Sequence, residues 1–231
     1  MKNSSDKALA IAKINFRQSK LTYIITVVVF LLVCLDATLD SYIFKTKGGE
    51  IGVGQVWYLG IILAAIFIPA LNFNKIMHLN GKKIDFFWGS LLNLIVFSAV
   101  IPILNLIIYY TFDKSCSTYH TVWNLVDIFG WSKNGIVLAY FQQFAFLLLA
   151  GVFIHTLTAA QSYWVGWLID IVLVVIISVF TPIEPLRAIL SWFFNLIIFN
   201  SNAFIQIISC LGISAVIYAA YLLVLRSIKI Q

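Results

Sequence analysis

Apolar stretches about as long as a bilayer-spanning helix recur along nearly the whole chain, and they limit what it can fold into. The first covers residues 21–42, and later ones cover 86–110, 135–158 and 203–225. A helix needs about 20 mainly apolar residues to cross the hydrocarbon core of a membrane. Since 62% of the 231 residues are hydrophobic and only 10% are charged, a soluble globular domain, a disordered chain and a coiled coil are excluded. The sequence therefore predicts an all-α integral membrane protein.

The apolar stretches divide the chain into six expected membrane-spanning helices within one domain, residues 21–231. Their predicted bounds are 21–42, 56–73, 86–110, 135–158, 164–180 and 203–225. A further apolar stretch, 186–199, is too short to cross a bilayer. It follows two prolines and ends at Asn200, so we expect short re-entrant outer helices between the fifth and sixth spans.

Residues 1–20 carry a different helical pattern, with cations and apolar side chains in separate sectors. The cations Lys13, Arg17 and Lys20 share one stripe of this helix. A helix of this kind lies in the membrane interface, so we predict an amphipathic elbow helix on the cytoplasmic surface. The alternative is a solvated basic start to the first span. The apolar sector consists of Ala8, Leu9, Ala12 and Phe16.

The cations are distributed unevenly over the expected connections, and this asymmetry predicts the orientation of the chain. Ten fall on the side that holds both termini: Lys2, Lys7, Lys13, Arg17, Lys20, Lys75, Lys82, Lys83, Arg226 and Lys229. The other side has five: Lys45, Lys47, Lys114, Lys133 and Arg187. Because lysine and arginine concentrate in cytoplasmic loops, we expect both termini in the cytoplasm. The net charge of +6 is thus a sign of orientation, and no nucleic-acid partner is expected.

The chain lacks the sequence motifs of an enzyme. Its Gly81-Lys82-Lys83 run is not a nucleotide-binding loop, because such a loop needs a glycine five residues before Gly81, where this chain has Ile76. The histidines and cysteines show no spacing typical of a metal site, a hydrolase or a redox motif: His78, His120, His155, Cys34, Cys116 and Cys210. We therefore expect no catalytic residue, and no metal or cofactor bound by this chain.

Polar and ionisable side chains inside the apolar runs are candidates for a substrate path, because placing them in lipid costs a few kcal/mol or more. Asp36 lies near the outer end of the first span, and Asp170 lies two turns into the fifth. The fourth span contains Gln142, Gln143 and His155. A cation or proton path through these residues is one interpretation. The other is that a residue such as Asp170 only forms hydrogen bonds between helices.

The predicted connection between the second and third spans, residues 74–87, mixes cations, a turn signal at Asn80-Gly81 and large apolar side chains. Such a segment can dock into a groove on a soluble partner, with phenylalanine or isoleucine side chains as anchors and lysines for registry. The alternative is a loop whose aromatics only mark the membrane interface. The candidate partner-binding residues are His78, Gly81, Lys82, Lys83, Asp85, Phe86 and Phe87.

The order of these parts resembles the permease subunit of ABC-2 type exporters. In that family the first inner loop is a coupling helix with a glycine, basic residues and an aromatic pair, matched here by Gly81, Lys82, Lys83, Phe86 and Phe87. The run 181–185, Thr-Pro-Ile-Glu-Pro, is similar to the family's entry into its short outer helices. The small size is most similar to bacterial permeases that export, or confer immunity to, amphipathic peptides, such as phenol-soluble-modulin and lantibiotic-immunity permeases.

The resemblance implies a transport subunit in the bacterial plasma membrane. It implies a dimer with a second copy or a paralogous permease, and two copies of a separate ABC ATPase that hold ATP and Mg. The substrate it implies is an amphipathic peptide moved out of the cell. The rival interpretation is a stand-alone ion-coupled carrier or channel that uses Asp36, Asp170 and His155.

Overall fold

The computed structural model describes residues 4–40, 49–118, 121–161 and 164–227, and most of them are helical. The helices are α1 (Ser4–Gln18), α2 (Lys20–Thr38), α3 (Tyr58–Phe67), α4 (Phe73–His78), α5 (Lys83–Ile108), α6 (Lys114–Cys116), α7 (Leu125–Ile128), α8 (Ile136–Ala160), α9 (Trp164–Phe180), α10 (Glu184–Phe194) and α11 (Ala203–Ser227). Short 3₁₀-helical segments adjoin them at η2 (Val53–Trp57) and η5 (Trp131–Asn134). Short π-helical segments are η3 (Ile68–Asn72), η4 (Tyr109–Asp113) and η6 (Asn195–Phe199). The strands are β1 (Gly49–Ile51) and β2 (Thr121–Trp123).

The described part of the chain has five helical segments long and apolar enough to cross a membrane. They are Lys20–Thr38, Val53–His78, Lys83–Cys116, Ile136–Ala160 and Ala203–Ser227. A sixth arises if α9 and the α10–η6 segment, which meet at 116°, form one broken span. The prediction of a mainly helical chain with several helices able to span a membrane is thus confirmed, and five or six such helices lie among the described residues.

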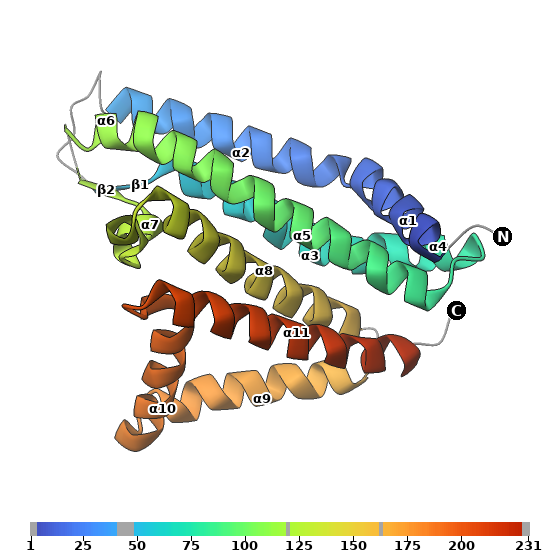
Figure 1. Cartoon of the computed structure of the whole chain (residues 1–231). Helices are drawn as coiled ribbons and strands as arrows, with labels where there is room; N and C mark the ends of the chain where they lie inside the picture. The colour runs from blue at the N-terminus through green and yellow to red at the C-terminus, as the bar shows by residue number, and fades with distance from the viewer. Residues whose placement is uncertain (1–3, 41–48, 119–120, 162–163, 228–231) are drawn as a thin grey trace.

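The long helices lie side by side and connect two ends of the molecule (Figure 1). We call the end that carries the N and C marks and α4 the terminal end, and the end with β1, β2, α6 and α7 the strand end. The helices α2, α5 and α9 run from the terminal end to the strand end, and α3, α8 and α11 return. The chain passes back and forth so that both of its ends lie at the terminal end.

The main core lies where α3, α5, α8 and α11 pack against one another. Ile61, Leu94 and Val152 are almost completely buried there. Gly151 permits the close approach of α8 and α3, because a Cβ at this position would lie 2.9 Å from Cδ1 of Ile61. Small residues at helix contacts are the usual means of close packing in membranes, where the hydrophobic effect does not drive helices together.

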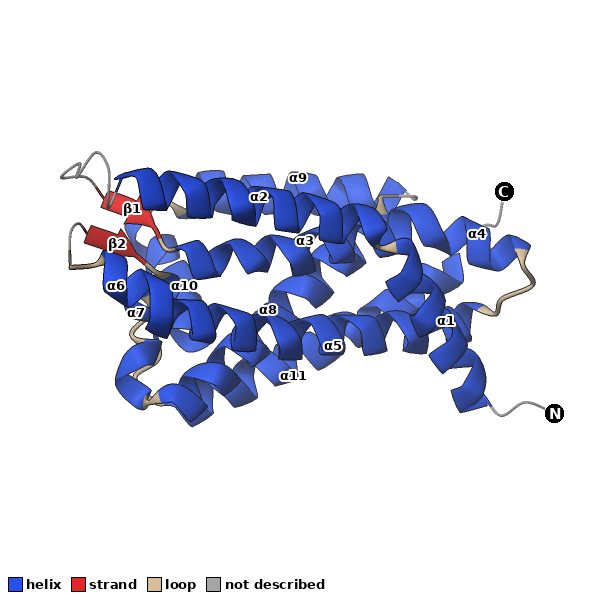
Figure 2. Cartoon of the chain, turned by 90° about the horizontal axis from the view of Figure 1, so that it is seen from above, coloured by secondary structure: helices blue, strands red, loops and turns tan. Residues whose placement is uncertain are grey.

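The α1 helix is present, and Figure 2 shows it turned away from the direction of α2 at the terminal end. It packs on α5 through Ala8, Ile11 and Ala12, while Leu9 and Phe16, expected in the same apolar sector, remain exposed. Close contact with Gly89 is the reason: a Cβ there would lie 2.7 Å from Cγ2 of Ile11, so the buried stripe centres on Ile11. The cations predicted for the opposite stripe are exposed.

The α9 helix diverges from the bundle, and α10 crosses from it to α11, so these three helices form a triangle (Figure 1). No residue of α10 is buried, and large apolar residues of α9, such as Trp167 and Ile171, are exposed. The short helices expected between 180 and 203 are therefore present as α10 and η6. They end before Asn200, and α11 begins at Ala203.

A network of hydrogen bonds connects the segments at the strand end. β1 and β2 pair in parallel, and both lie outside the predicted spans (Figure 2). The carboxylate of Asp113 accepts hydrogen bonds from the backbone N–H of Val53 (3.0 Å) and from Nδ2 of Asn124 (2.7 Å). Gln55 Nε2 donates to the carbonyl of Trp123 at 3.2 Å. These bonds tie the segment before α3 to the far end of α5 and the loop that follows it.

Candidate functional site

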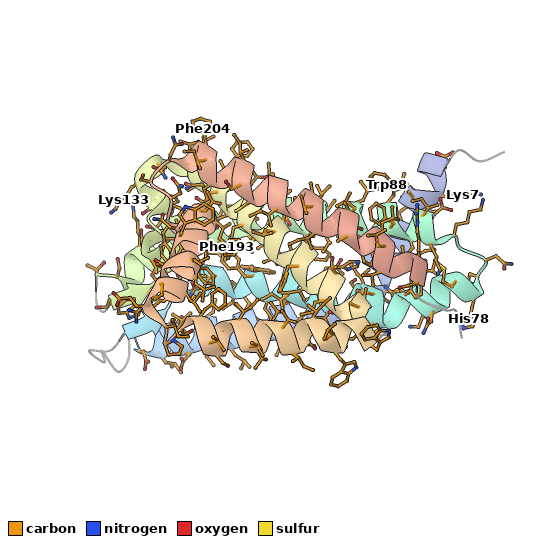
Figure 3. The ribbon with its side chains drawn as sticks, turned by 90° about the horizontal axis from the view of Figure 1, so that it is seen from below. Lys7, His78, Trp88, Lys133, Phe193 and Phe204 are labelled. Atoms are coloured by element: carbon orange, nitrogen blue, oxygen red, sulfur yellow. The ribbon has the colours of Figure 1, made fainter. Side chains whose placement is uncertain are left out.

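The turn between α4 and α5 projects at the terminal end, where Figure 3 places His78. Asn80 adopts the left-handed conformation, with φ of 59°, which asparagine tolerates better than most residues. The N–H of Gly81 donates to the carbonyl of Ile76 at 2.9 Å. A Cβ on Gly81 would lie 2.7 Å from that same oxygen, so only glycine fits. The turn is therefore held in one backbone conformation.

The first turns of α5 are fixed to the rest of the bundle by aromatic packing. Phe86 is fully buried and meets Phe73 edge to face, with ring centroids 5.3 Å apart. Phe87 packs on Tyr218, with centroids 4.5 Å apart, and the Tyr218 hydroxyl donates to the carbonyl of Phe87 at 2.6 Å. Asp85 is buried as well. The turn between α4 and α5 is thus braced by α4 and α11.

Phe86 and Phe87, predicted as anchors in a partner's groove, lie inside the chain in this structure, and their role at a partner stays a prediction. Both side chains are occupied inside this chain, because α4 covers one and α11 covers the other. The outward-facing part of residues 74–87 is a different set, which we call the turn surface. It consists of the exposed side chains of Asn74, Lys75, His78, Leu79, Asn80, Lys82 and Ile84.

The turn surface combines positive charge with an apolar tip. Leu79 is 74% exposed, and the cations Lys75 and Lys82 flank it in the sequence. Lys83, predicted for the same role, instead donates from Nζ to the carbonyl of Arg226 at 3.2 Å and so links α5 to the end of α11. A partner that matches this surface would need an apolar pocket with acidic groups around it.

Gln142 and Gln143, both predicted for a substrate path, are completely buried in α8 and hydrogen-bonded within the chain. Oε1 of Gln143 accepts from the Tyr58 hydroxyl (2.7 Å) and from Nδ2 of Asn105 (2.6 Å), which joins α8 to α3 and α5. Oε1 of Gln142 accepts from Nδ2 of Asn134 at 3.1 Å. In this structure the two glutamines cross-link helices.

The three ionisable residues of the predicted path do not come together. Asp36 is exposed near the strand end of α2, whereas His155 is buried near the terminal end of α8. Asp170 accepts a hydrogen bond from Nε2 of Gln161 at 2.6 Å, so it secures the connection between α8 and α9. This agrees with the interpretation that Asp170 forms a hydrogen bond between helices, and no cluster of the three exists.

His155 has an unusual environment for a polar side chain. It is completely buried, and neither ring nitrogen has a hydrogen-bond partner. Its ring lies edge to face with that of Tyr221, with centroids 5.0 Å apart, and the Tyr221 hydroxyl is also unpartnered. Among the described residues, no group of three or more histidine, cysteine or acidic side chains could hold a metal ion.

Several residues of these interior contacts were missed from the sequence. Tyr58, Asn105 and Gln206 partner the glutamines, and Tyr218 and Tyr221 surround His155. The amides had a readable signal, since Asn105 and Gln206 each interrupt an apolar run and polar groups in lipid need partners. The tyrosines had none, because tyrosine is also common at membrane interfaces.

No protein-family model, no curated protein and no solved structure matches this chain. The resemblance to ABC-2 permeases therefore stays a prediction.

Proposed function

We propose that this chain is the permease subunit of an ATP-driven exporter in a bacterial plasma membrane, with both termini in the cytoplasm. Its observed features support this role in two ways. Several helices are long and apolar enough to form a membrane-embedded body, and the exposed α4–α5 turn would offer a contact site for a soluble motor. ATP and Mg would be bound by a separate ABC ATPase, and this chain would contribute no catalytic group.

The observation that carries the proposal is that the α4–α5 turn is packed against the bundle on one side and exposed on the other. Phe86 and Phe87 fix the start of α5 to α4 and α11, while Leu79 and Lys82 face outward. A force applied to the turn surface is therefore transmitted to α3–α4, α5 and α11 together. Such rigid-body coupling is how closure of an ATPase pair can change the accessibility of a membrane path.

The distribution of described cations supports the orientation. The terminal end has Lys7, Lys13, Arg17, Lys20, Lys75, Lys82, Lys83 and Arg226, and the strand end has Lys114, Lys133 and Arg187. The predicted cations Lys2, Lys45, Lys47 and Lys229 lie outside the described residues. By the positive-inside rule the terminal end, with the turn surface, would face the cytoplasm and its ATPases.

The proposed substrate is an amphipathic peptide, and the proposed assembly is a dimer with a second copy or a paralogous permease. The exposed apolar side chains of α9 and α10 would supply surface for the second permease or for the substrate. Gln142 and Gln143 in the interior of the single chain are hydrogen-bonded to neighbouring segments. We therefore place the path between two permeases, outside the core of each.

The test is transport by inverted vesicles that contain this chain and the ABC ATPase encoded next to its gene. Leu79→Asp and Lys82→Glu should each reduce co-purification of the ATPase and ATP-driven uptake of the peptide into these vesicles. Lys133→Glu, a matched charge reversal at the strand end, should leave both unchanged. Equal effects of all three variants, or the absence of an ABC ATPase gene nearby, would contradict the proposal.

A second arm of the same assay distinguishes the rival carrier. Peptide uptake into the vesicles is measured with ATP, with an ATPase whose catalytic glutamate is replaced, and with an imposed proton gradient alone. The exporter needs ATP and the intact ATPase. Transport driven by the gradient alone, and lost in Asp36→Asn, Asp170→Asn or His155→Gln, would establish the ion-coupled carrier instead.

A further inference from the structure

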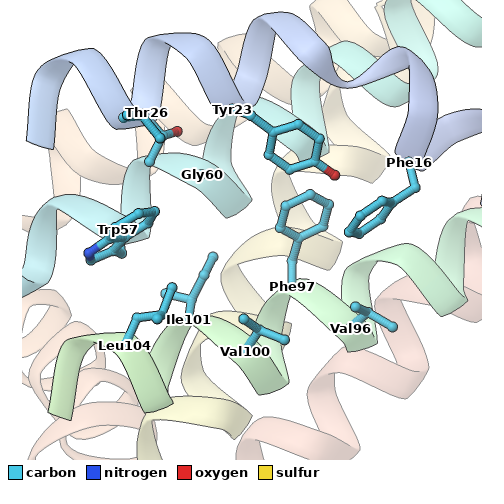
Figure 4. A pocket seen from close by; sticks show the side chains of 11 residues that line it. Phe16, Tyr23, Thr26, Trp57, Gly60, Val96, Phe97, Val100, Ile101 and Leu104 are labelled. Atoms are coloured by element: carbon cyan, nitrogen blue, oxygen red, sulfur yellow. The ribbon is translucent and has the colours of Figure 1, made fainter. Parts of the chain in front are cut away.

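A lateral pocket opens between α2, α3 and α5 (Figure 4). Its volume is about 170 Å³, and aromatic and aliphatic side chains form most of its wall. Along α5 the lining residues extend from Val96 to Leu104, which corresponds to about 12 Å at 1.5 Å per residue. The pocket is therefore elongated along the helix axis, as a hydrocarbon chain in a bilayer would be.

The pocket wall also carries polar groups that have no partner. Thr26 is only 3% exposed, and its hydroxyl makes no hydrogen bond in the chain. The Tyr23 hydroxyl and Nε1 of Trp57 are unpartnered as well. Figure 4 shows the Tyr23 hydroxyl directed toward Phe16, at the terminal end of the pocket. These atoms are themselves covered, so the surface that the pocket presents to a ligand is almost wholly apolar.

A second groove, between α1 and α5, continues the pocket toward the terminal end. Phe16 and Val96 line both, so the two are adjacent. The groove also contains Lys13 and Arg17, which are exposed and lie one turn apart on α1. Neither set of lining residues includes an acid. The order along the molecule is thus positive charge in the groove and then an apolar slot.

We propose that this composite groove binds one anionic phospholipid from the leaflet at the terminal end. Lys13 and Arg17 bind the phosphate at the terminal end of the slot. One acyl chain lies in the slot beside Val100. The occupant comes from the bilayer because exposed residues of α2 and α5, Val27 and Val100, line the pocket and open it sideways. A cationic peptide is disfavoured because both charged groups at the mouth are positive.

The proposal has a structural consequence that does not depend on the exporter function. The lipid would contact α1, α2 and α5 at once and hold the α1–α2 bend against the bundle. Basic groups on the cytoplasmic side of helical membrane proteins are typical sites for anionic headgroups. Each cation close to an anionic headgroup stabilises binding by about 1 kcal/mol, so removing both should weaken it roughly 30-fold.

Native mass spectrometry of the delipidated full-length protein, titrated with phosphatidylglycerol or phosphatidylcholine of identical acyl chains, tests this. One high-affinity phosphatidylglycerol should bind, at least tenfold more tightly than phosphatidylcholine. The double variant Lys13→Gln/Arg17→Gln should lose this preference. The matched control is Lys7→Gln/Lys20→Gln, which removes two exposed cations of the same region outside the groove, and it should keep the preference.

A variant of the slot separates headgroup binding from chain binding. Val100→Phe fills the pocket without altering charge, and it should weaken binding of both lipids about equally. Circular dichroism and thermal unfolding check that each variant is folded. Equal affinity for the two lipids in the unmodified protein would overturn the proposal. So would an equal loss in the control pair, or full binding to folded Val100→Phe.

Discussion

Nε2 of Gln142 donates a hydrogen bond of 2.5 Å to Oε1 of Gln206, and this bond joins α8 to α11 in the interior of the bundle. Gln206 in turn donates from Nε2 to the carbonyl of Ile197 at 3.1 Å. Trp131 Nε1 donates to the neighbouring carbonyl, that of Ile198, at 3.2 Å. The π-helical η6 segment is thus held to the bundle by side chains of α8, α11 and η5. In α10, which precedes it, no residue is buried.

Gln206→Leu should lower the free energy of unfolding by about 1 kcal/mol, the size typical of interhelical hydrogen bonds in membranes. The variant leaves Nε2 of Gln142 without its acceptor and removes the Gln206 donor from the Ile197 carbonyl, which keeps only the weak Sγ donor of Cys210 at 3.3 Å. Amide hydrogen exchange across 195–199 should rise more than elsewhere. Ile208→Val, at an exposed position of the same helix, is the control and should change neither. Unchanged exchange in Gln206→Leu would mean that α10 and η6 are held by other contacts.

Truncation of Phe86 should lower the stability of the protein, whereas truncation of Leu79 should weaken its binding to the ATPase. Phe86→Ala removes a fully buried ring and should lower the free energy of unfolding by about 3 kcal/mol. Leu79→Ala, at the exposed tip, should leave stability unchanged and weaken co-purification of the ATPase. Thermal unfolding in detergent and affinity capture provide the two measurements. A stable Phe86→Ala protein that fails to bind the ATPase would instead support a direct role of that ring as an anchor.

Gly81→Ala should destabilise the α4–α5 turn, because the added Cβ meets the Ile76 carbonyl oxygen at 2.7 Å. We expect a loss of about 1–2 kcal/mol in the free energy of unfolding. Gly212→Ala is the matched control, since nothing lies within 4 Å of its added Cβ. Alanine also favours a helix over glycine, so this control should be neutral or slightly stabilising. Similar effects at both glycines would show that the turn is not held as the structure has it.

Cysteine labelling tests which end of the bundle faces the cytoplasm. In a cysteine-free background, Lys82→Cys should resist a membrane-impermeant thiol reagent in whole cells and react in inverted vesicles. Lys133→Cys, exposed at the strand end, should show the reverse. Native Cys116 is a poor reporter of that end, because it is only 2% exposed. Reaction at Lys82→Cys in intact cells would invert the orientation.

The positions of the helices could be read from the sequence, because the width of the hydrocarbon core sets the length of an apolar run. The expected first span, 21–42, and last span, 203–225, agree with α2 and α11 to within a few residues. The break before α11 was also readable, since Asn200 and its polar neighbours interrupt an apolar run. Neighbouring cations marked the turn between α4 and α5 as a polar connection.

The faces of the helices were not readable, and only folding in three dimensions assigned them. In a soluble protein the apolar side of a helix faces the core, but a helix in lipid is apolar on all sides. Nothing local therefore shows that Phe86 points inward while Leu79 points outward. The same holds for Gln142 and Gln143, whose partners come from distant segments. Their roles follow from which helices pack together, which depends on close contacts such as that of Gly151 with α3.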